Sequence, residues 1–247
     1  MLTVEAQRHP MVVRRLVRVG LACLLLLGAS VAPASGATKA YKIDLGTRSD
    51  FVAQTNFVQC VGASMQMMLN MIQSKDDRSA ATQLELQQLA RELSGRRPEG
   101  DERQGASVRG WTKGLNRLGA GPYQLYGGTT IEDALLAAAK AIRLTGKPVG
   151  LLMWRGRHAW VMSGFRATGD PLLPGSRVTA VYVEDPLYPY GSSVWGASPR
   201  PGAALSVEEL GRQYVPRRQS NRFGPNLSGK YVLVLPYVID ARTMRQA

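Results

Sequence analysis

Apolar residues recur with two different patterns along the chain, and the pattern changes near residue 149. Between residues 60 and 141 most apolar positions follow helical spacing, whereas later apolar residues form short runs of Val, Leu, Tyr and Trp bounded by Gly, Pro and Asp. Helices followed by strands, without regular alternation, are typical of α+β domains with an antiparallel sheet. We therefore expect an α+β fold in which N-terminal helices pack against an antiparallel sheet.

Four helices are predicted in the first part of the chain. Segment 60–72 is apolar around most of its circumference, which is typical of a buried central helix rather than a surface one. Thr82 and Glu85 have the spacing of a capping box, and Thr130 with Asp133 marks another helix start. The predicted helices are 60–72, 82–95, 108–118 and 130–141.

Strands dominate the prediction after residue 149. The final strand is expected to complete the sheet, and a small helix is expected near 207–213. Segment 41–59 is predicted to be extended, and segment 96–105 is predicted to be an exposed loop. The predicted strands are 123–126, 149–154, 159–165, 178–184 and 231–238.

The first 37 residues have the organisation of an export signal. Four arginines lie within residues 8–18, an uncharged run follows over 19–32, and small residues fill 34–37. We expect cleavage near Gly36 or Ala37 and a secreted or cell-surface protein. The alternative is a retained membrane anchor, although the apolar run is shorter than the roughly 20 residues that a spanning helix needs.

The remaining residues, 38–247, are expected to form a single domain. The chain has 247 residues, of which 45% are hydrophobic and 20% charged, so it can bury a core and is not a disordered tail. From about residue 196 the sequence becomes rich in Pro, Arg and Gly, and we interpret this part as a C-terminal extension of the domain.

The chain is strongly basic. Its net charge is +13, and removal of residues 1–37 takes away four arginines and Glu5, which leaves +10. Such a charge can favour anionic cell-envelope polymers, or it can belong to an ordinary solvated surface. Specific nucleic-acid binding is not expected, because no basic run is interleaved with aromatic residues.

Cysteine and histidine are scarce. Cleavage of the signal would remove Cys23 and His9 and leave Cys60 and His158. One cysteine cannot form a disulfide within the chain, and one residue of each kind cannot make a Cys/His zinc site. We therefore expect no metal and no cofactor.

Cys60 lies at the predicted start of the central helix. The positive end of the helix dipole and the free N–H groups of the first turn favour an anion, so a thiol there ionises more readily. The alternative is a small buried residue that packs beside Met67 and Met68. The methionines of this helix, which include Met65 and Met71, are expected to belong to the core.

His158 and Asp185 lie at the ends of two predicted strands. His158 begins the strand after a polar turn, and Asp185 ends the next strand directly before Pro186. If the two strands are antiparallel neighbours, the carboxylate lies close to the imidazole and can hold it in one tautomer. Taken singly, the aspartate also suits an Asp-Pro turn. Trp154 and Trp160 are expected to pack the sheet, whereas Trp195 is a candidate for the rim of a groove.

Three motifs resemble those of papain-like cysteine peptidases, and among them the bacteriocin-processing, double-glycine peptidase domains. The motifs are Gln54–Cys60, Gly156–Val161 and Val183–Pro186, and the resemblance covers roughly residues 50 to 190. It implies a papain-like fold with Cys60 as the nucleophile, His158 as general base and then acid, Asp185 as the orienting group, and Gln54 as a donor to the oxyanion.

The chain departs from these relatives in two respects. They carry glycine directly after the cysteine, whereas this chain has Val61 and then Gly62. They are also fused to transporters, whereas this chain has no ATP-binding motif and no membrane bundle, so their leader specificity is not implied.

The sequence thus favours an exported thiol hydrolase that cleaves a peptide or isopeptide bond in a peptide or protein substrate. Two alternatives remain. One is a transglutaminase-like acyl transferase, which would use the same residues but exclude water. The other is a non-catalytic module that binds a cell-envelope ligand on the same scaffold.

Overall fold

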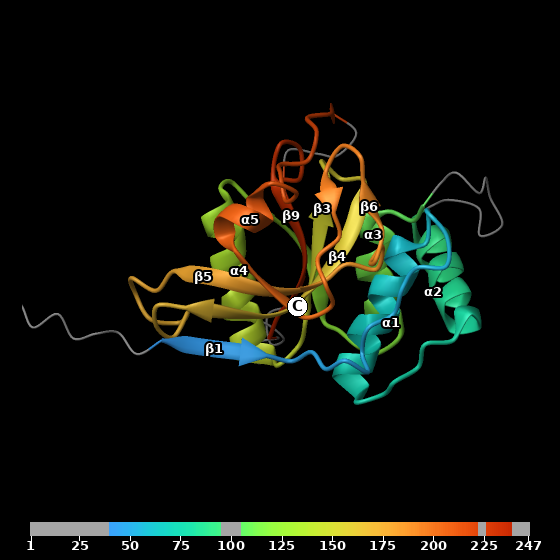
Figure 1. Ribbon diagram of the computed structural model, residues 1–247, viewed down its shortest axis with the longest axis horizontal. Coiled ribbons are helices and arrows are strands. Elements are labelled where there is room, and N and C mark those ends of the chain that lie inside the picture. Colours follow the sequence, from blue (N-terminus) through green and yellow to red (C-terminus); the bar gives the residue numbers. More distant parts are fainter. Residues whose placement is uncertain (1–39, 95–104, 222–225, 239–247) are drawn as a thin grey trace, which may run out of the picture. The chain divides into compact units, whose positions relative to one another are not determined.

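The computed structural model describes residues 40–94, 105–221 and 226–238 (Figure 1). The predicted export signal and nearly all of the predicted loop 96–105 lie outside the described residues. The described residues belong to one compact unit. None of their helices has the length and hydropathy required to cross a membrane.

The elements follow the predicted order, and the α+β class with an antiparallel sheet is confirmed. The helices of the described residues are α1 (Cys60–Gln73), α2 (Ala80–Leu93), α3 (Val108–Arg117), α4 (Ile131–Thr145) and α5 (Val207–Gly211). The strands are β1 (Tyr41–Asp44), β2 (Tyr123–Gly128), β3 (Val149–Met153), β4 (His158–Ala167), β5 (Val178–Glu184), β6 (Gly191–Ser192), β7 (Gly196–Ala197), β8 (Ala203–Ser206) and β9 (Tyr231–Pro236).

The main sheet separates two groups of helices (Figure 1). Its strands follow the order β2-β9-β3-β4-β5-β8, with β1 paired to β4, and every pairing is antiparallel. Side chains alternate along β4, so Ala159 and Val161 pack with α1 and α3 while Trp160 and Met162 pack with α4. The sheet is therefore buried on both faces, with one apolar cluster on each side.

Helix α1 is buried along most of its length, as its apolar circumference predicts. Met65, Met67 and Met68 are fully buried, which confirms their assignment to the core. Helix α2 crosses α1 at Gly62, where an added Cβ atom would lie 2.6 Å from a backbone oxygen of α2. The Gly62 N–H donates to Gln87 Oε1 over 2.9 Å. The glycine after Val61 therefore permits close packing of the two helices.

Of the two predicted capping boxes, one is found in the structure and the other is not. The capping box of Thr130 and Asp133 at the start of α4 is confirmed. The capping box predicted at Thr82 and Glu85 is wrong, because α2 begins earlier and Ser79 is its N-cap, accepting from the Thr82 N–H. The Thr82 hydroxyl instead donates to Asp77 over 2.7 Å.

The sheet takes in segments that the sequence pattern did not mark as strands. Strand β1 lies at the start of the predicted extended segment 41–59 and pairs with β4, while β8 pairs with β5. Strand β9, predicted as the final strand, lies in the interior of the sheet between β2 and β3. The Pro/Arg/Gly-rich part beyond residue 196 therefore supplies two strands to the main sheet.

Candidate active site

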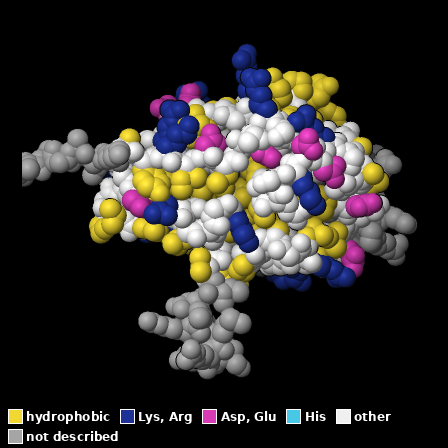
Figure 2. Space-filling view, turned by 90° about the horizontal axis from the view of Figure 1, so that it is seen from below, with side chains coloured by type: hydrophobic (Ala, Val, Ile, Leu, Met, Phe, Trp, Pro, Cys, Tyr) yellow, Lys and Arg dark blue, Asp and Glu magenta, His cyan; other side chains and the backbone are white. Residues whose placement is uncertain are grey.

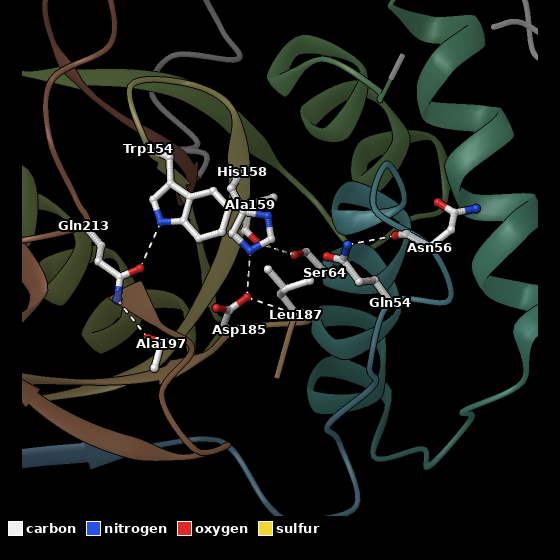
Figure 3. Close-up of polar contacts among 10 residues, drawn as sticks. All are labelled: Gln54, Asn56, Ser64, Trp154, His158, Ala159, Asp185, Leu187, Ala197 and Gln213. Atoms are coloured by element: carbon white, nitrogen blue, oxygen red, sulfur yellow. Dashed lines mark hydrogen bonds and ion pairs between the residues drawn. The ribbon is translucent and has the colours of Figure 1, made fainter. Parts of the chain in front are cut away.

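His158 and Asp185 meet at the ends of two neighbouring strands. His158 is the first residue of β4, and Asp185 follows directly after β5, which pairs antiparallel with β4. The distance from His158 Nε2 to Asp185 Oδ1 is 2.7 Å, and both side chains are buried (Figure 3). The same Oδ1 atom accepts from the Leu187 N–H over 2.9 Å, which fixes the carboxylate. The predicted proximity of this pair is confirmed.

Cys60 is the first residue of α1 and lines the same cleft as His158, whose pKa it influences. Since Asp185 contacts Nε2, the other ring nitrogen is left for the thiol. Burial lowers the pKa of His158, but the hydrogen bonds with Asp185 and Cys60 and the charges of both groups outweigh it and raise the pKa to about 9. The imidazole is therefore held as a cation at neutral pH, between a carboxylate and a thiol.

The start of α1 is fixed firmly beside β4. Ser64, one turn after Cys60, donates its hydroxyl to the Ala159 carbonyl over 3.3 Å (Figure 3). The N-cap residue, Gln59, does not cap the helix with its side chain. Cys60 therefore lies at the positive end of a buried 14-residue helix, as predicted.

Gln54 lies beside this group without lining the cleft. Its backbone N–H donates to the Pro186 carbonyl over 2.7 Å, which joins its segment to the one that follows Asp185. Its side-chain Nε2 donates to the Asn56 carbonyl over 2.8 Å, so one of its two amide protons is engaged (Figure 3). Its Oε1 atom is buried and has no partner among the described residues. Its role as an oxyanion donor stays a prediction.

Trp154 packs directly on the imidazole of His158. The ring centroids are 4.1 Å apart with an interplanar angle of 23°. Trp154 Nε1 donates to Gln213 Oε1 over 2.9 Å, and Gln213 Nε2 donates to the Ala197 carbonyl over 3.1 Å (Figure 3). The indole is thus held in place from the segment after α5, and it covers one face of the histidine ring.

The predicted packing of Trp160 and Trp154 on the sheet is confirmed, whereas the predicted rim position of Trp195 is not. Trp160 packs in the sheet core as expected, but Trp154 does more than pack the sheet. Its backbone is left-handed, with φ of 56°, and the two residues after it also have positive φ. Such a turn at a non-glycine residue has no clear sequence signal. Trp195, predicted at the rim, is not among the described residues that line the cleft.

A cleft of about 280 Å³ opens at Cys60 and His158. One wall comes from the start of α3 and from β3, with apolar side chains that include Val108, Trp111 and Leu152. Exposed Phe57, Val61 and the arginines Arg157 and Arg217 also line it. The cleft therefore offers an apolar surface and cationic groups next to the thiol. Trp111 and Arg217 could not be assigned to this place from the sequence pattern, because each comes from a distant segment.

Glu184, next to Asp185, is a buried carboxyl group that does not contact His158. It is 2% exposed, and its Oε2 atom has no partner among the described residues. Burial, together with the charges of Asp44 and Asp50, raises the pKa of Glu184 to about 8. The folded protein therefore holds a proton on this group that the unfolded chain releases near pH 4.5.

We expect Glu184→Gln to become more stable relative to the wild type as the pH rises from 4.5 to 8. The raised pKa means that the unfolded chain binds fewer protons in this window, so the wild type loses stability while the isosteric amide does not. The gain in Tm at pH 8.5 should reach about 5 °C, with a much smaller difference at pH 4.5. Thermal unfolding followed by circular dichroism measures it, and parallel curves of Tm against pH would contradict the raised pKa of Glu184.

The described residues contain no group of three His, Cys, Asp or Glu side chains placed to hold a metal ion. No protein-family profile matches the chain, and comparisons with curated proteins and with solved structures also give no match. The function of this site must therefore be inferred from its own geometry.

Proposed function

We propose that this protein is a thiol hydrolase that cleaves a peptide or isopeptide bond. The observation that carries the proposal is the buried chain of contacts from Cys60 through His158 to Asp185, which ends at an open cleft. A cysteine at a helix N-terminus, paired with a histidine that a carboxylate orients, is the arrangement that activates a thiol nucleophile. A binding module would not require these three groups to touch one another.

In the proposed reaction, the Cys60 thiolate attacks the carbonyl carbon and forms a C–S bond, while the carbonyl electrons move to oxygen. The backbone N–H of Cys60, with the second amide proton of Gln54, would stabilise that oxyanion. The intermediate collapses when the C–N bond breaks and the His158 imidazolium gives its proton to the leaving amine. A water molecule, deprotonated by His158, then attacks the thioester and releases the acid and the Cys60 thiolate.

Asp185 and Trp154 support His158 in this scheme. The carboxylate stabilises the imidazolium that pairs with the thiolate, and its bond to Nε2 directs the other nitrogen to Cys60. The indole restricts the ring to one plane and excludes water from one of its faces. The same three reacting groups could pass the acyl group to an amine, which would make the protein an acyl transferase. Export by the N-terminal signal is part of the proposal and places the substrate outside the cytoplasm.

The test is the rate of alkylation by iodoacetamide as a function of pH, in the wild type and in His158→Ala. A free thiol ionises with a midpoint of about pH 8.5. The wild-type rate should reach half its plateau well below this pH, because the imidazolium stabilises the thiolate. In His158→Ala the midpoint should return towards that of a free thiol.

Cys60→Ser serves as the control for the site of labelling, since Cys23 is the other cysteine of the chain. Peptide mass mapping identifies the labelled cysteine. An unreactive Cys60, or the same titration midpoint in the wild type and in His158→Ala, would contradict the proposed hydrolase and favour the binding module.

A further inference from the structure

Two arginines from distant segments, Arg157 and Arg217, line the cleft, and Arg155 and Arg218 lie next to them along the chain. Arg155 and Arg157 belong to the turn between β3 and β4, whereas Arg217 and Arg218 precede β9. The Arg218 N–H donates to the Arg155 carbonyl over 3.4 Å. The Arg217 side chain passes so close to Gly156 that an added Cβ atom there would lie 3.2 Å from its Cγ atom. We call these four residues the arginine cluster.

The arginine cluster is held by the backbone and joins the catalytic group directly. Arg157 precedes His158, and its N–H donates to the Met153 carbonyl over 3.0 Å. The Arg217 N–H donates to the Lys230 carbonyl over 2.8 Å, next to β9. Arg157 and Arg217 line the same cleft as Cys60. The backbone of Arg157 and of Arg217 therefore has a defined position relative to the thiol.

The charge beside the cleft is of one sign in the described part of the chain. No Asp or Glu is among the described residues that line the cleft. Arg155, Arg157 and Arg218 form no ion pair with a described carboxylate. Figure 2 shows a face of the molecule on which Lys and Arg side chains are mixed with Asp and Glu.

Arg217 differs from its neighbours in being half-buried. Burial lowers the pKa of its guanidinium, although the group remains charged at any physiological pH. A cation that has lost part of its hydration gains more from an anionic ligand than an exposed cation does. The planar guanidinium suits a carboxylate, because it can donate two parallel hydrogen bonds.

We infer that the cleft selects an acidic peptide segment, with Asp or Glu side chains close to the bond that Cys60 attacks. The inference rests on the proposed function for the position of that bond. The apolar wall of Val108, Trp111 and Leu152 accepts the uncharged part of the peptide, and the arginine cluster binds its carboxylates. Positive charge focused at a cleft also raises the rate of encounter with an anionic ligand, by tenfold or more in order of magnitude.

Two peptidyl vinyl sulfones test the inference on the full-length protein. One probe carries Glu at the two positions before the electrophile, and the other carries Gln there. In both, the Cys60 sulfur adds to the terminal vinyl carbon, and the neighbouring carbon takes a proton. We expect inactivation by the Glu probe to be on the order of tenfold faster at low salt, with the ratio falling as salt is added.

Arg157→Gln/Arg218→Gln should lower the ratio of the two rates several-fold towards one, with Arg155 and Arg217 still in place. Lys140→Gln/Arg177→Gln, which removes the same charge from α4 and from the start of β5, should keep it, because Arg177 lines a different pocket. A change in thiol reactivity affects both probes equally, so it cancels in the ratio of the Glu rate to the Gln rate. A ratio within twofold of one in the wild type, or an equal loss in both double variants, would overturn the inference.

A binding measurement separates this inference from the proposed function. Fluorescence anisotropy of a labelled Glu-rich peptide and its Gln counterpart is recorded with Cys60→Ser, which needs no reaction. A Glu preference that Arg157→Gln/Arg218→Gln weakens several-fold would support the acidic specificity even if iodoacetamide showed no activated thiol. Equal binding of the two peptides, together with an activated thiol, would overturn the acidic specificity but would not contradict the proposed hydrolase.

Discussion

Asp185→Ala is expected to lower the rate of peptide cleavage by on the order of 10² to 10³. The substitution removes the acceptor of the 2.7 Å bond to His158 Nε2, so the ring loses its fixed tautomer. It also removes one of the groups that raise the pKa of His158 to about 9, while burial, which lowers it, remains. The basic limb of the pH–rate profile should therefore move from about pH 9 to lower pH.

The conservative variant Asp185→Asn should recover part of this rate. Its amide oxygen can still accept from Nε2, but it carries no charge to stabilise the imidazolium, so its basic limb should also lie below that of the wild type. The measurement is the steady-state hydrolysis of a fluorogenic acidic peptide from pH 5 to 10.

Glu184→Gln is the matched control, because it replaces a neighbouring buried carboxyl group, whereas the carboxyl bonded to His158 belongs to Asp185. Its rate near neutral pH should stay within a few-fold of the wild type. If Asp185→Ala and Glu184→Gln reduced the rate equally, the carboxylate would act through the stability of the fold and not on the imidazole.

Truncation after Gly229 is expected to abolish cooperative unfolding. It removes β9, whose residues pair with β2 along one edge and with β3 along the other. The loss would leave backbone groups of both neighbours without partners and open both apolar clusters, since Val234 belongs to one and Leu233 to the other. Circular dichroism should show no thermal transition, and a truncated protein that retained a sharp one would contradict the interior position of β9.

A milder change tests the same strand in a protein that still folds. Leu233→Ala should lower the free energy of unfolding by about 2–5 kcal/mol, because the side chain is fully buried. Leu173→Ala makes the same chemical change at a residue that is 65% exposed, and its effect should stay within about 0.5 kcal/mol. Urea unfolding measures both values, and equal losses would show that β9 does not pack as described.

The sequence predicted the elements best where local signals were strong. The apolar circumference of α1 and the Thr130–Asp133 capping box identified their helices, because packing and capping there depend on neighbours within a few residues. Strands β1 and β8 were missed, since each has four residues and is fixed by pairing with a distant strand. At the start of α2, both Ser79 and Thr82 carry a hydroxyl that could cap the helix. The Thr82 hydroxyl donates to Asp77, and Ser79 is the N-cap.

The same distinction holds for the candidate site. Cys60, His158 and Asp185 could be identified because each occupies the end of a predictable element, and antiparallel pairing brings the last two together. Trp154 could not, because its contact with His158 depends on a left-handed turn that the residue types do not specify. Arg217 reaches the cleft through tertiary contacts alone.

The interior position of β9 also determines when the site can form during synthesis. Strand β2 must wait for a partner that is made about 100 residues later, which takes roughly 5 to 20 seconds at ordinary rates of translation. Cys60, His158 and Asp185 all emerge before that partner does. A nascent chain therefore carries every residue of the candidate site before β9, an interior strand of the same sheet, has been made.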